Sequence, residues 1–401
     1  MKLDTILAEP EKSLQYMERL VNNGSPSNFS FKYITSHQTC PLYVSQYPMC
    51  ILRDSSEKFM SYGDLSLDTC FKKNNYIYIH PDWKDVFNDL RIEETPLFAY
   101  PTSSSRTVRL SNSDVYIKMA YPGVLGRITR ELRKEHIFSS IDVTSILNQL
   151  IQQKTAPVSL SFFPETGGKV YKSKHCEIGY VIRHTKPSGK RVNQIKALIP
   201  AFSLFSNDRV SQNDVPLIIQ LLCIKDSPIN YLLYELIYPI IDIYFFCIFN
   251  GGIQPEMHSQ NFMIGIDSQF NIPSIILRDL ESMDKDISIM RTYQLDNHLL
   301  SFPFKCISEK QYNYKIKHSF MYDHKLGEYF FDPLIKCVQQ YGFANEGEIE
   351  NAIKIYVKET YGNKLINFFP QNGLWYKFDN VLIDRNVSTR PYITNSNIKY
   401  R

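Results

Sequence analysis

The sequence contains no run of basic residues, no Cys-x-x-Cys pair and no low-complexity tract. Lysine and arginine are spread along the chain and the formal net charge is only +4, so no nucleic acid is expected as a partner. Apolar residues make up 43% of the 401 positions and charged residues 21%, the composition of a soluble globular protein. This length exceeds the usual size of one hydrophobic core, so two or three lobes are expected.

The eight cysteines lack the Cys-x-x-Cys pairs that are typical of a structural zinc site. Disulfides are not needed to stabilise a chain of this length. Cys223 and Cys247 lie in apolar helical stretches. The cysteines are therefore predicted to be reduced thiols in the core.

No long hydrophobic run opens the chain, since Met1–Leu20 mixes charged and apolar residues. No signal peptide is expected, and the predicted location is cytoplasmic. The segment Ile229–Asn250 is apolar enough to suggest a membrane span, but it contains Glu235 and Asp242. Carboxylates are rare near the middle of a membrane-crossing helix, so the segment is predicted to be a buried core helix, with no membrane partner.

The pattern of apolar residues predicts an α+β fold with a largely helical C-terminal half. Helices are expected near 5–21 and over 127–153, and helical periodicity dominates from 215 to 249 and again from 297 to 365. Strands are expected at 76–80, at the end of 97–109, and over 115–120, 158–163, 180–184, 197–202, 262–266 and 274–278. The chain is divided into 1–95, a β-rich lobe over 96–214, and a helical lobe over 215–401.

A first polar constellation combines Ser104-Ser105-Arg106-Thr107 with Lys118 and with Arg127 and Arg130. Arginine neutralises a polyphosphate through its planar fork, and short hydroxyls donate hydrogen bonds to the remaining oxygens. Lys118 is expected on the next strand, and Arg130 follows twelve residues later. The alternative is an ordinary serine-rich turn with solvated surface cations.

A second constellation is Glu256-Met257-His258-Ser259-Gln260-Asn261, followed by Arg278-Asp279. If the first segment is extended, Glu256, His258 and Gln260 share one face. Burying them without partners would be costly. Glu256 and Asp279 together offer the hard oxygen ligands that Mg²⁺ needs beside nucleotide phosphates. The alternative is a buried polar network that only holds two strands together.

Read in order, these motifs resemble those of the NRPS-independent siderophore synthetases, the aerobactin-synthetase-like (IucA/IucC) enzymes. The resemblance runs from about residue 76 to 280 and uses His80-Pro81, Ser104–Thr107, Lys118, Arg130, Ile182-Arg183-His184, Glu256–Asn261 and Arg278-Asp279. Family members are typically longer, and the missing length falls before His80. An early Gly-His-Pro-x-His-Pro-x-x-Lys segment of the family has no counterpart here, so residues 1–95 are interpreted as a reduced N-terminal region.

The resemblance implies a cupped-hand fold and an ATP-dependent ligase of siderophore biosynthesis. Such an enzyme converts a carboxylic acid, such as citrate, into an acyl-adenylate and joins it to an amine or an alcohol. By resemblance, Ser104, Arg106, Thr107 and Lys118 contact the phosphates of ATP, and Arg130 and His258 hold the carboxylate. Glu256 and Asp279 carry Mg²⁺, and Gln260, Asn261 and Arg278 surround the nucleotide. A homodimer is also suggested by the family.

Two other functions stay open. A kinase-like phosphotransferase would place an asparagine five residues after a catalytic aspartate, and no aspartate precedes Asn261 at that spacing. A non-catalytic relative that binds nucleotide or serves as a partner subunit is favoured by the shortened N-terminal region. The products separate the alternatives, because the ligase releases AMP and pyrophosphate whereas the kinase releases ADP.

Overall fold

The computed structural model describes residues 1–21, 44–54, 58–68, 75–86, 91–104, 106–122, 124–125, 128–129, 132–172, 177–211, 214–371, 373–376, 392–395 and 398–401. Among them is an eight-stranded antiparallel sheet with the order β2-β10-β11-β6-β5-β4-β1-β3. Its strands are β1 (Tyr47–Arg53), β2 (Phe59–Gly63), β3 (Tyr76–Ile79), β4 (Arg91–Pro101), β5 (Thr107–Leu110), β6 (Val115–Met119), β10 (Glu165–Lys172) and β11 (Glu177–His184).

A second sheet has five strands in the order β12-β9-β16-β15-β13, of which only β9 and β16 are parallel. Its strands are β9 (Leu160–Phe162), β12 (Ser188–Gly189), β13 (Ala197–Pro200), β15 (Phe262–Ile266) and β16 (Ser274–Leu277). A small sheet joins β14 (Ile253–Gln254), β17 (Asp284–Asp286) and β18 (Cys306–Ile307). The short pairs are β7 (Val124–Leu125) with β8 (Ile128–Thr129), and β19 (Gly373–Tyr376) with β20 (Tyr392–Asn395).

Helices make up most of the second half of the chain. They are α5 (Leu217–Cys223), α6 (Pro228–Asn230), η5 (Tyr231–Ile237), α7 (Tyr238–Gly251), α8 (Ile287–Thr292), α9 (Tyr314–Ser319), η8 (Phe320–Phe331), α10 (Asp332–Gln340) and α11 (Glu348–Phe368). The first half contains α1 (Leu3–Ala8), α2 (Pro10–Leu20) and α4 (Lys134–Ile151). Single turns are η2 (Pro81–Asp85), η3 (Val192–Gln194), η4 (Ala201–Leu204), η6 (Leu280–Ser282) and η7 (Asp296–His298).

One continuous helix of the described chain, Pro228–Gly251, is long and apolar enough to cross a membrane. In the structure 67% of its most apolar stretch is buried, and Tyr244, Phe245 and Cys247 are completely inaccessible. The sequence-based prediction of a core helix is confirmed. The helix ends at Gly252, whose φ of 60° lies in the left-handed region that glycine adopts without steric cost.

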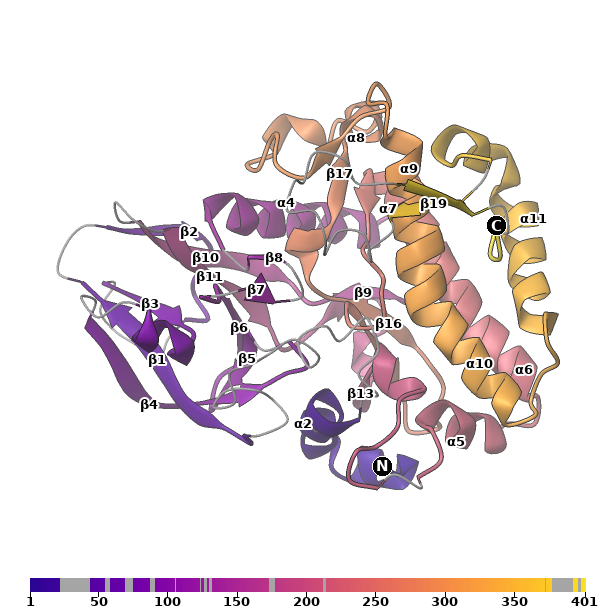
Figure 1. Ribbon diagram of the computed structural model, residues 1–401, viewed down its shortest axis with the longest axis horizontal. Coiled ribbons are helices and arrows are strands. Elements are labelled where there is room, and N and C mark those ends of the chain that lie inside the picture. Colours follow the sequence, from indigo (N-terminus) through magenta and orange to yellow (C-terminus); the bar gives the residue numbers. More distant parts are fainter. Residues whose placement is uncertain are drawn as a thin grey trace.

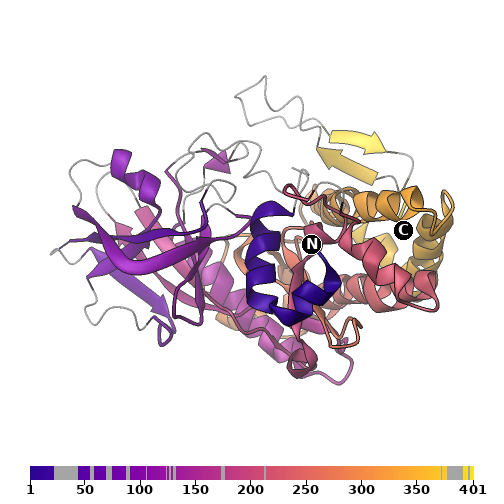
Figure 2. The same cartoon turned by 90° about the horizontal axis from the view of Figure 1, so that it is seen from below.

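The molecule has two lobes, with the five-stranded sheet between them (Figure 1). The eight-stranded sheet forms one lobe, and α4 packs against its strand β10. The helices η5, α7, η8, α10 and α11 form the other lobe, and the five-stranded sheet lies between the lobes. Seen from below, α1 and α2 lie across this junction (Figure 2). Helix α2 packs on β13 of the five-stranded sheet and also contacts β4 of the eight-stranded sheet.

The predicted α+β class, with strands in the first half and helices in the second, is confirmed. The predicted helix over 127–153 is wrong at its start, because β8 occupies 128–129 and α4 begins at Lys134. The domain limits at 95/96 and 214/215 stay predictions. Strands from both sides of the first limit share the eight-stranded sheet, and strands from both sides of the second share the five-stranded sheet.

Candidate active site

Two buried cations of the eight-stranded sheet face the junction between the lobes. Arg106 ends the turn before β5, and Lys118 lies on β6, where it pairs in register with Thr107. The backbone N–H of Met119 donates to the carbonyl of Arg106 at 2.8 Å, so the ladder of the two strands holds both residues together. Lys118 is only 1% exposed, which requires anionic partners nearby.

The partners come from the turn that follows β16. Glu281 lies 3.1 Å from Arg106 Nη2 and 2.7 Å from Lys118 Nζ, measured from Oε1. Lys118 also contacts Asp279, whose φ of 69° is unusual for a residue other than glycine. With this backbone conformation, the carboxylates of Asp279 and Glu281 both contact cations of the eight-stranded sheet. Strained backbone conformations are concentrated at functional sites.

A third cation, Arg183 on β11, completes the cluster. Its Nη2 lies 3.1 Å from Asp279 Oδ1, and its Nε donates to Glu165 at 2.8 Å. Burial would raise the pKa of Asp279, but the charges of Lys118 and Arg183 hold it well below the usual range. Burial opposes the ionisation of Glu281 in the same way, and Lys118 and Arg106 lower its pKa. Both carboxylates are therefore ionised at neutral pH.

Glu256 and His258 lie in the turn after β14. Glu256 Oε1 forms an ion pair with Lys325 of η8 at 3.0 Å. Burial raises the pKa of Glu256, but the charge of Lys325, with a contribution from Lys305, lowers it to about 2. Burial lowers the pKa of His258 to about 4 against the opposing charges of Glu256 and Asp279. His258 is therefore neutral at pH 7 and lies within the field of both carboxylates.

The tautomer of His258 follows from its hydrogen bond. Its Nδ1 accepts from the backbone N–H of Gln260 at 3.3 Å, so the proton of the neutral ring resides on Nε2. The turn is closed by Asn261 N–H, which donates to the carbonyl of His258 at 2.8 Å. The extended conformation considered for 256–260 is not formed throughout, because the backbone turns from His258 onward. Local turn formation, rather than strand alternation, orients these side chains.

Arg278 and Gln260 link this turn to α2 and to the turn between β4 and β5. Arg278 forms a buried ion pair with Glu18 of α2, and its Nε donates to the carbonyl of Gln260 at 2.6 Å. The side-chain amide of Gln260 donates to the carbonyl of Ser103 at 3.2 Å. Gln260 and Arg278 thus lie beside the turn that carries Ser104 and Thr107, whose hydroxyls are 3.5 Å apart.

Three buried polar atoms of the site have no hydrogen-bond partner within the described part of the chain. They are Nη1 of Arg106, Nδ2 of Asn261 and Oε2 of Glu281. Buried polar atoms are normally satisfied, so each of these atoms is available to a bound water, ion or ligand. The two donors can bind an anion such as a phosphate, whereas the carboxylate oxygen of Glu281 can accept from a donor or bind a cation. Of the sequence-predicted residues, Lys118 contacts Asp279 directly and Arg106 is linked to Lys118 through Glu281, whereas Arg130 lies outside the described residues.

The site also contains residues that sequence reasoning missed: Glu18, Glu165, Glu281, Lys305 and Lys325. Glu281 follows Asp279 by two positions, which was the only local signal for any of them. His80 accepts from the backbone N–H of Asp82 and caps η2, and Trp83 donates to the carbonyl of Ala120. The contacts of His80 and Trp83 therefore stabilise the local fold of the segment His80–Lys84.

The predicted magnesium ligands are each ion-paired, Glu256 with Lys325 and Asp279 with Lys118 and Arg183. Nowhere in the described ranges do three or more histidine, cysteine, aspartate or glutamate side chains gather closely enough to hold a metal ion. Magnesium, however, is often bound by one or two carboxylates together with substrate phosphates. Both carboxylates are ionised, which is the form in which a carboxylate binds Mg²⁺.

The half-buried His258 is expected to make the protein less stable as the pH falls from about 6.5 to about 4. In this window the unfolded chain binds a proton on the histidine, and the folded protein does not. Unfolding is therefore favoured progressively as the pH decreases. Urea unfolding across this range is expected to show a shallower pH dependence for His258→Asn than for the wild type. Equal slopes would mean that His258 titrates normally in the folded state.

No family model matches the sequence, and no curated protein matches it. Solved structures do match. The ATP-bound aerobactin synthetase IucA from Klebsiella pneumoniae superposes with a TM-score of 0.70 at 13% identity, covering 98% of this chain and 80% of that one.

Two other synthetases share the arrangement. The petrobactin biosynthesis protein AsbB from Bacillus anthracis has a TM-score of 0.71 at 13% identity, covering 98% of this chain and 78% of that one. The aerobactin synthetase IucC from Klebsiella pneumoniae has a TM-score of 0.64 at 12% identity, covering 90% of this chain and 71% of that one. The order of motifs and the similarity over nearly the whole chain agree, so the protein has the fold of the NRPS-independent siderophore synthetases.

Proposed function

We propose that the protein is an ATP-dependent ligase that activates a carboxylic acid as its adenylate and condenses it with an amine or an alcohol in siderophore-type biosynthesis. The observation that carries this proposal is the contact of Arg106 and Lys118 with Asp279 and Glu281 across the junction of the lobes. The fold supports it, because solved synthetases share it and one of them is ATP-bound. Fold alone would not suffice, since one fold can host several chemistries.

The charge balance of the site supports ATP together with a divalent cation. Five cations face four carboxylates in the described part of the site: Arg106, Lys118, Arg183, Lys305 and Lys325 against Glu165, Glu256, Asp279 and Glu281. This small excess of positive charge does not neutralise a triphosphate. Mg²⁺ held by Glu256 and Asp279 would supply the rest and would polarise the phosphate oxygens.

The protein residues then have separate tasks. Ser104, Arg106, Thr107 and Lys118 bind the phosphates, and Gln260, Asn261 and Arg278 surround the nucleotide. Arg130 and His258 hold the carboxylate, His258 as a neutral donor through Nε2. A carboxylate oxygen forms a bond to the α-phosphorus while the bond to pyrophosphate breaks. The nucleophile then attacks the acyl carbon, loses a proton and displaces AMP.

The test is a screen for pyrophosphate release over a panel of di- and tricarboxylic acids, with hydroxylamine as a surrogate nucleophile. The expected result is one or a few acids that give AMP and pyrophosphate in equal amounts, with all release lost in EDTA and restored by Mg²⁺. Formation of ADP would instead indicate a phosphotransferase. The protein is further proposed to be cytoplasmic and to act as a homodimer, which sedimentation at assay concentration would test.

A non-catalytic relative is the second candidate. It is favoured by the ion pairs that already occupy Glu256 and Asp279, because each carboxylate must exchange a lysine contact for a metal contact. This candidate predicts thermal stabilisation by ATP without turnover of any acid in the panel.

A further inference from the structure

One buried face of α2 carries a single carboxylate. Ser13, Leu14, Met17 and Glu18 are the buried residues of this helix, and their spacing places them on one face. Leu14 and Met17 contact apolar residues, as expected for an amphipathic helix. Glu18 is only 4% exposed, although a glutamate is almost never buried without a partner. Its position therefore requires a specific explanation.

The carboxylate of Glu18 joins the two halves of the site. Its Oε2 accepts from the backbone N–H of Ser103 at 2.8 Å, and its Oε1 forms the ion pair with Arg278. Arg278 in turn donates from Nη2 to the hydroxyl of Ser103 at 3.3 Å. Ser103 belongs to the turn between β4 and β5 of the eight-stranded sheet. Arg278 follows β16 of the five-stranded sheet, so three elements meet at one carboxylate.

The same ring includes the turn of His258. Gln260 donates from its side chain to the carbonyl of Ser103 at 3.2 Å and accepts at its own carbonyl from Arg278 Nε at 2.6 Å. Ser103 directly precedes Ser104, and Arg278 directly precedes Asp279. A shift of the Glu18 carboxylate would therefore move both the turn carrying Arg106 and the strained turn carrying Asp279.

We propose that Glu18 is a positioning residue that fixes the Ser103–Thr107 turn against Arg278 and so sets the geometry in which ATP is bound. The proposal rests on the ligase function proposed above. It assigns to the first twenty residues a part in nucleotide binding.

The charge of Glu18 is essential to this role. Burial raises its pKa, but the charge of Arg278 and the hydrogen bonds from Arg278 and Ser103 outweigh this and lower the pKa, so the carboxylate stays ionised. A neutral side chain of the same shape would leave the guanidinium of Arg278 buried without a counter-charge. Arg278 would then move toward other acceptors and release the turn.

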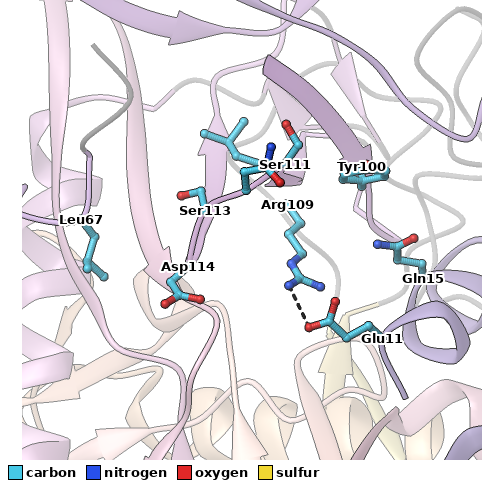
Figure 3. A pocket seen from close by; sticks show the side chains of 10 residues that line it. Glu11, Gln15, Leu67, Tyr100, Arg109, Ser111, Ser113 and Asp114 are labelled. Atoms are coloured by element: carbon cyan, nitrogen blue, oxygen red, sulfur yellow. Dashed lines mark hydrogen bonds and ion pairs between the residues drawn. The ribbon is translucent and has the colours of Figure 1, made fainter. Parts of the chain in front are cut away.

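The experiment compares Glu18→Gln with Glu11→Gln in the full chain. Glu11 lies on the same helix, but it is exposed and pairs with Arg109 of β5 at 3.2 Å in a pocket of about 600 Å³ (Figure 3). Hydrogen exchange of the peptide covering 101–107 reports on the Ser103 N–H. Calorimetric titration with ATP and Mg²⁺ reports on binding, and steady-state kinetics separate the KM for ATP from kcat.

Glu18→Gln is expected to accelerate exchange in 101–107 and to weaken ATP binding and raise the KM for ATP by about tenfold, the size of one lost charge-assisted contact. Glu11→Gln is expected to behave as the wild type. Wild-type ATP affinity in Glu18→Gln would overturn the proposal, as would slower exchange in 101–107. If the variant does not fold, Glu18→Asp keeps the charge with a shorter reach and is expected to give a smaller shift in the same direction.

The two proposals fail differently. If the wild type neither binds ATP nor releases pyrophosphate, the ligase function is wrong. In that case faster hydrogen exchange of 101–107 in Glu18→Gln would show that Glu18 positions the turn. The role of Glu18 in ATP binding would then be wrong. If the wild type is active and Glu18→Gln loses only thermal stability with an unchanged KM, Glu18 is structural and the inference is wrong.

Discussion

Lys118→Met is expected to reduce pyrophosphate release about a thousandfold, by the scale of losing a preorganised charge at a reacting phosphate. The ammonium lies between Asp279 and Glu281 and is 1% exposed. Without it, the buried carboxylate of Glu281 and the half-buried carboxylate of Asp279 keep only the charges of Arg106 and Arg183. Removing one partner of a buried ion pair also costs about 3–5 kcal/mol of stability. The assay is ATP-dependent pyrophosphate release, with urea unfolding measured in parallel.

Lys169→Met is the matched control for this variant. Lys169 is a second buried lysine of the same sheet, on β10, but it faces Asp68 at 3.9 Å and the ring of Tyr76 at 4.3 Å. Its loss is expected to lower the free energy of unfolding and to leave the affinity for ATP unchanged. If both variants lose activity in proportion to their stability, Lys118 has no special role at the site.

Arg106→Ala is expected to raise the barrier to adenylation by about 2.7–4 kcal/mol, the cost of losing one preorganised donor to developing negative charge. Arg106 lies 3.1 Å from Glu281 and keeps Nη1 without a partner in the described structure, ready to donate to a ligand. Arg106→Lys retains the charge but loses the planar fork, so it should recover only part of the rate. The measurement is kcat/KM for ATP in pyrophosphate release.

Arg109→Ala provides the comparison on the same strand. Arg109 lies on β5 three residues after Arg106, and it pairs with Glu11 in the pocket of about 600 Å³ and not with Glu281. It should keep wild-type kinetics. Full adenylation by Arg106→Ala would contradict the assignment of Arg106 to the phosphates.

The fold was predictable from the sequence in outline because local patterns are strong where strands are buried. The alternation at 115–120 placed Lys118 on a strand, and the apolar stretch at 229–250 with its two carboxylates predicted a core helix. The limits of elements were less predictable. Residues 127–133 read as helical, but β8 occupies 128–129 and α4 begins only at Lys134. Tertiary contacts decide such borderline segments.

The proximity of site residues that are far apart in the sequence could be predicted only from the order of the motifs. Asp279 and Lys118 are 161 positions apart, and no periodicity links them. Glu18 and Lys325 were missed because a single charged residue in a helical pattern looks the same whether it faces water or a partner. A shared face for Glu256, His258 and Gln260 was argued only for an extended segment, and local hydrogen bonds instead form a turn at 258–261.

The ion pair between Glu18 and Arg278 joins residues 260 positions apart. During translation, α2 leaves the ribosome long before Arg278 has been made, so the carboxylate of Glu18 stays hydrated on the nascent chain. Contacts of such sequence separation form late, because the closure of the intervening loop costs entropy that only the finished packing repays. A growing chain therefore cannot form the contact between Glu18 and Arg278 before synthesis has passed Arg278.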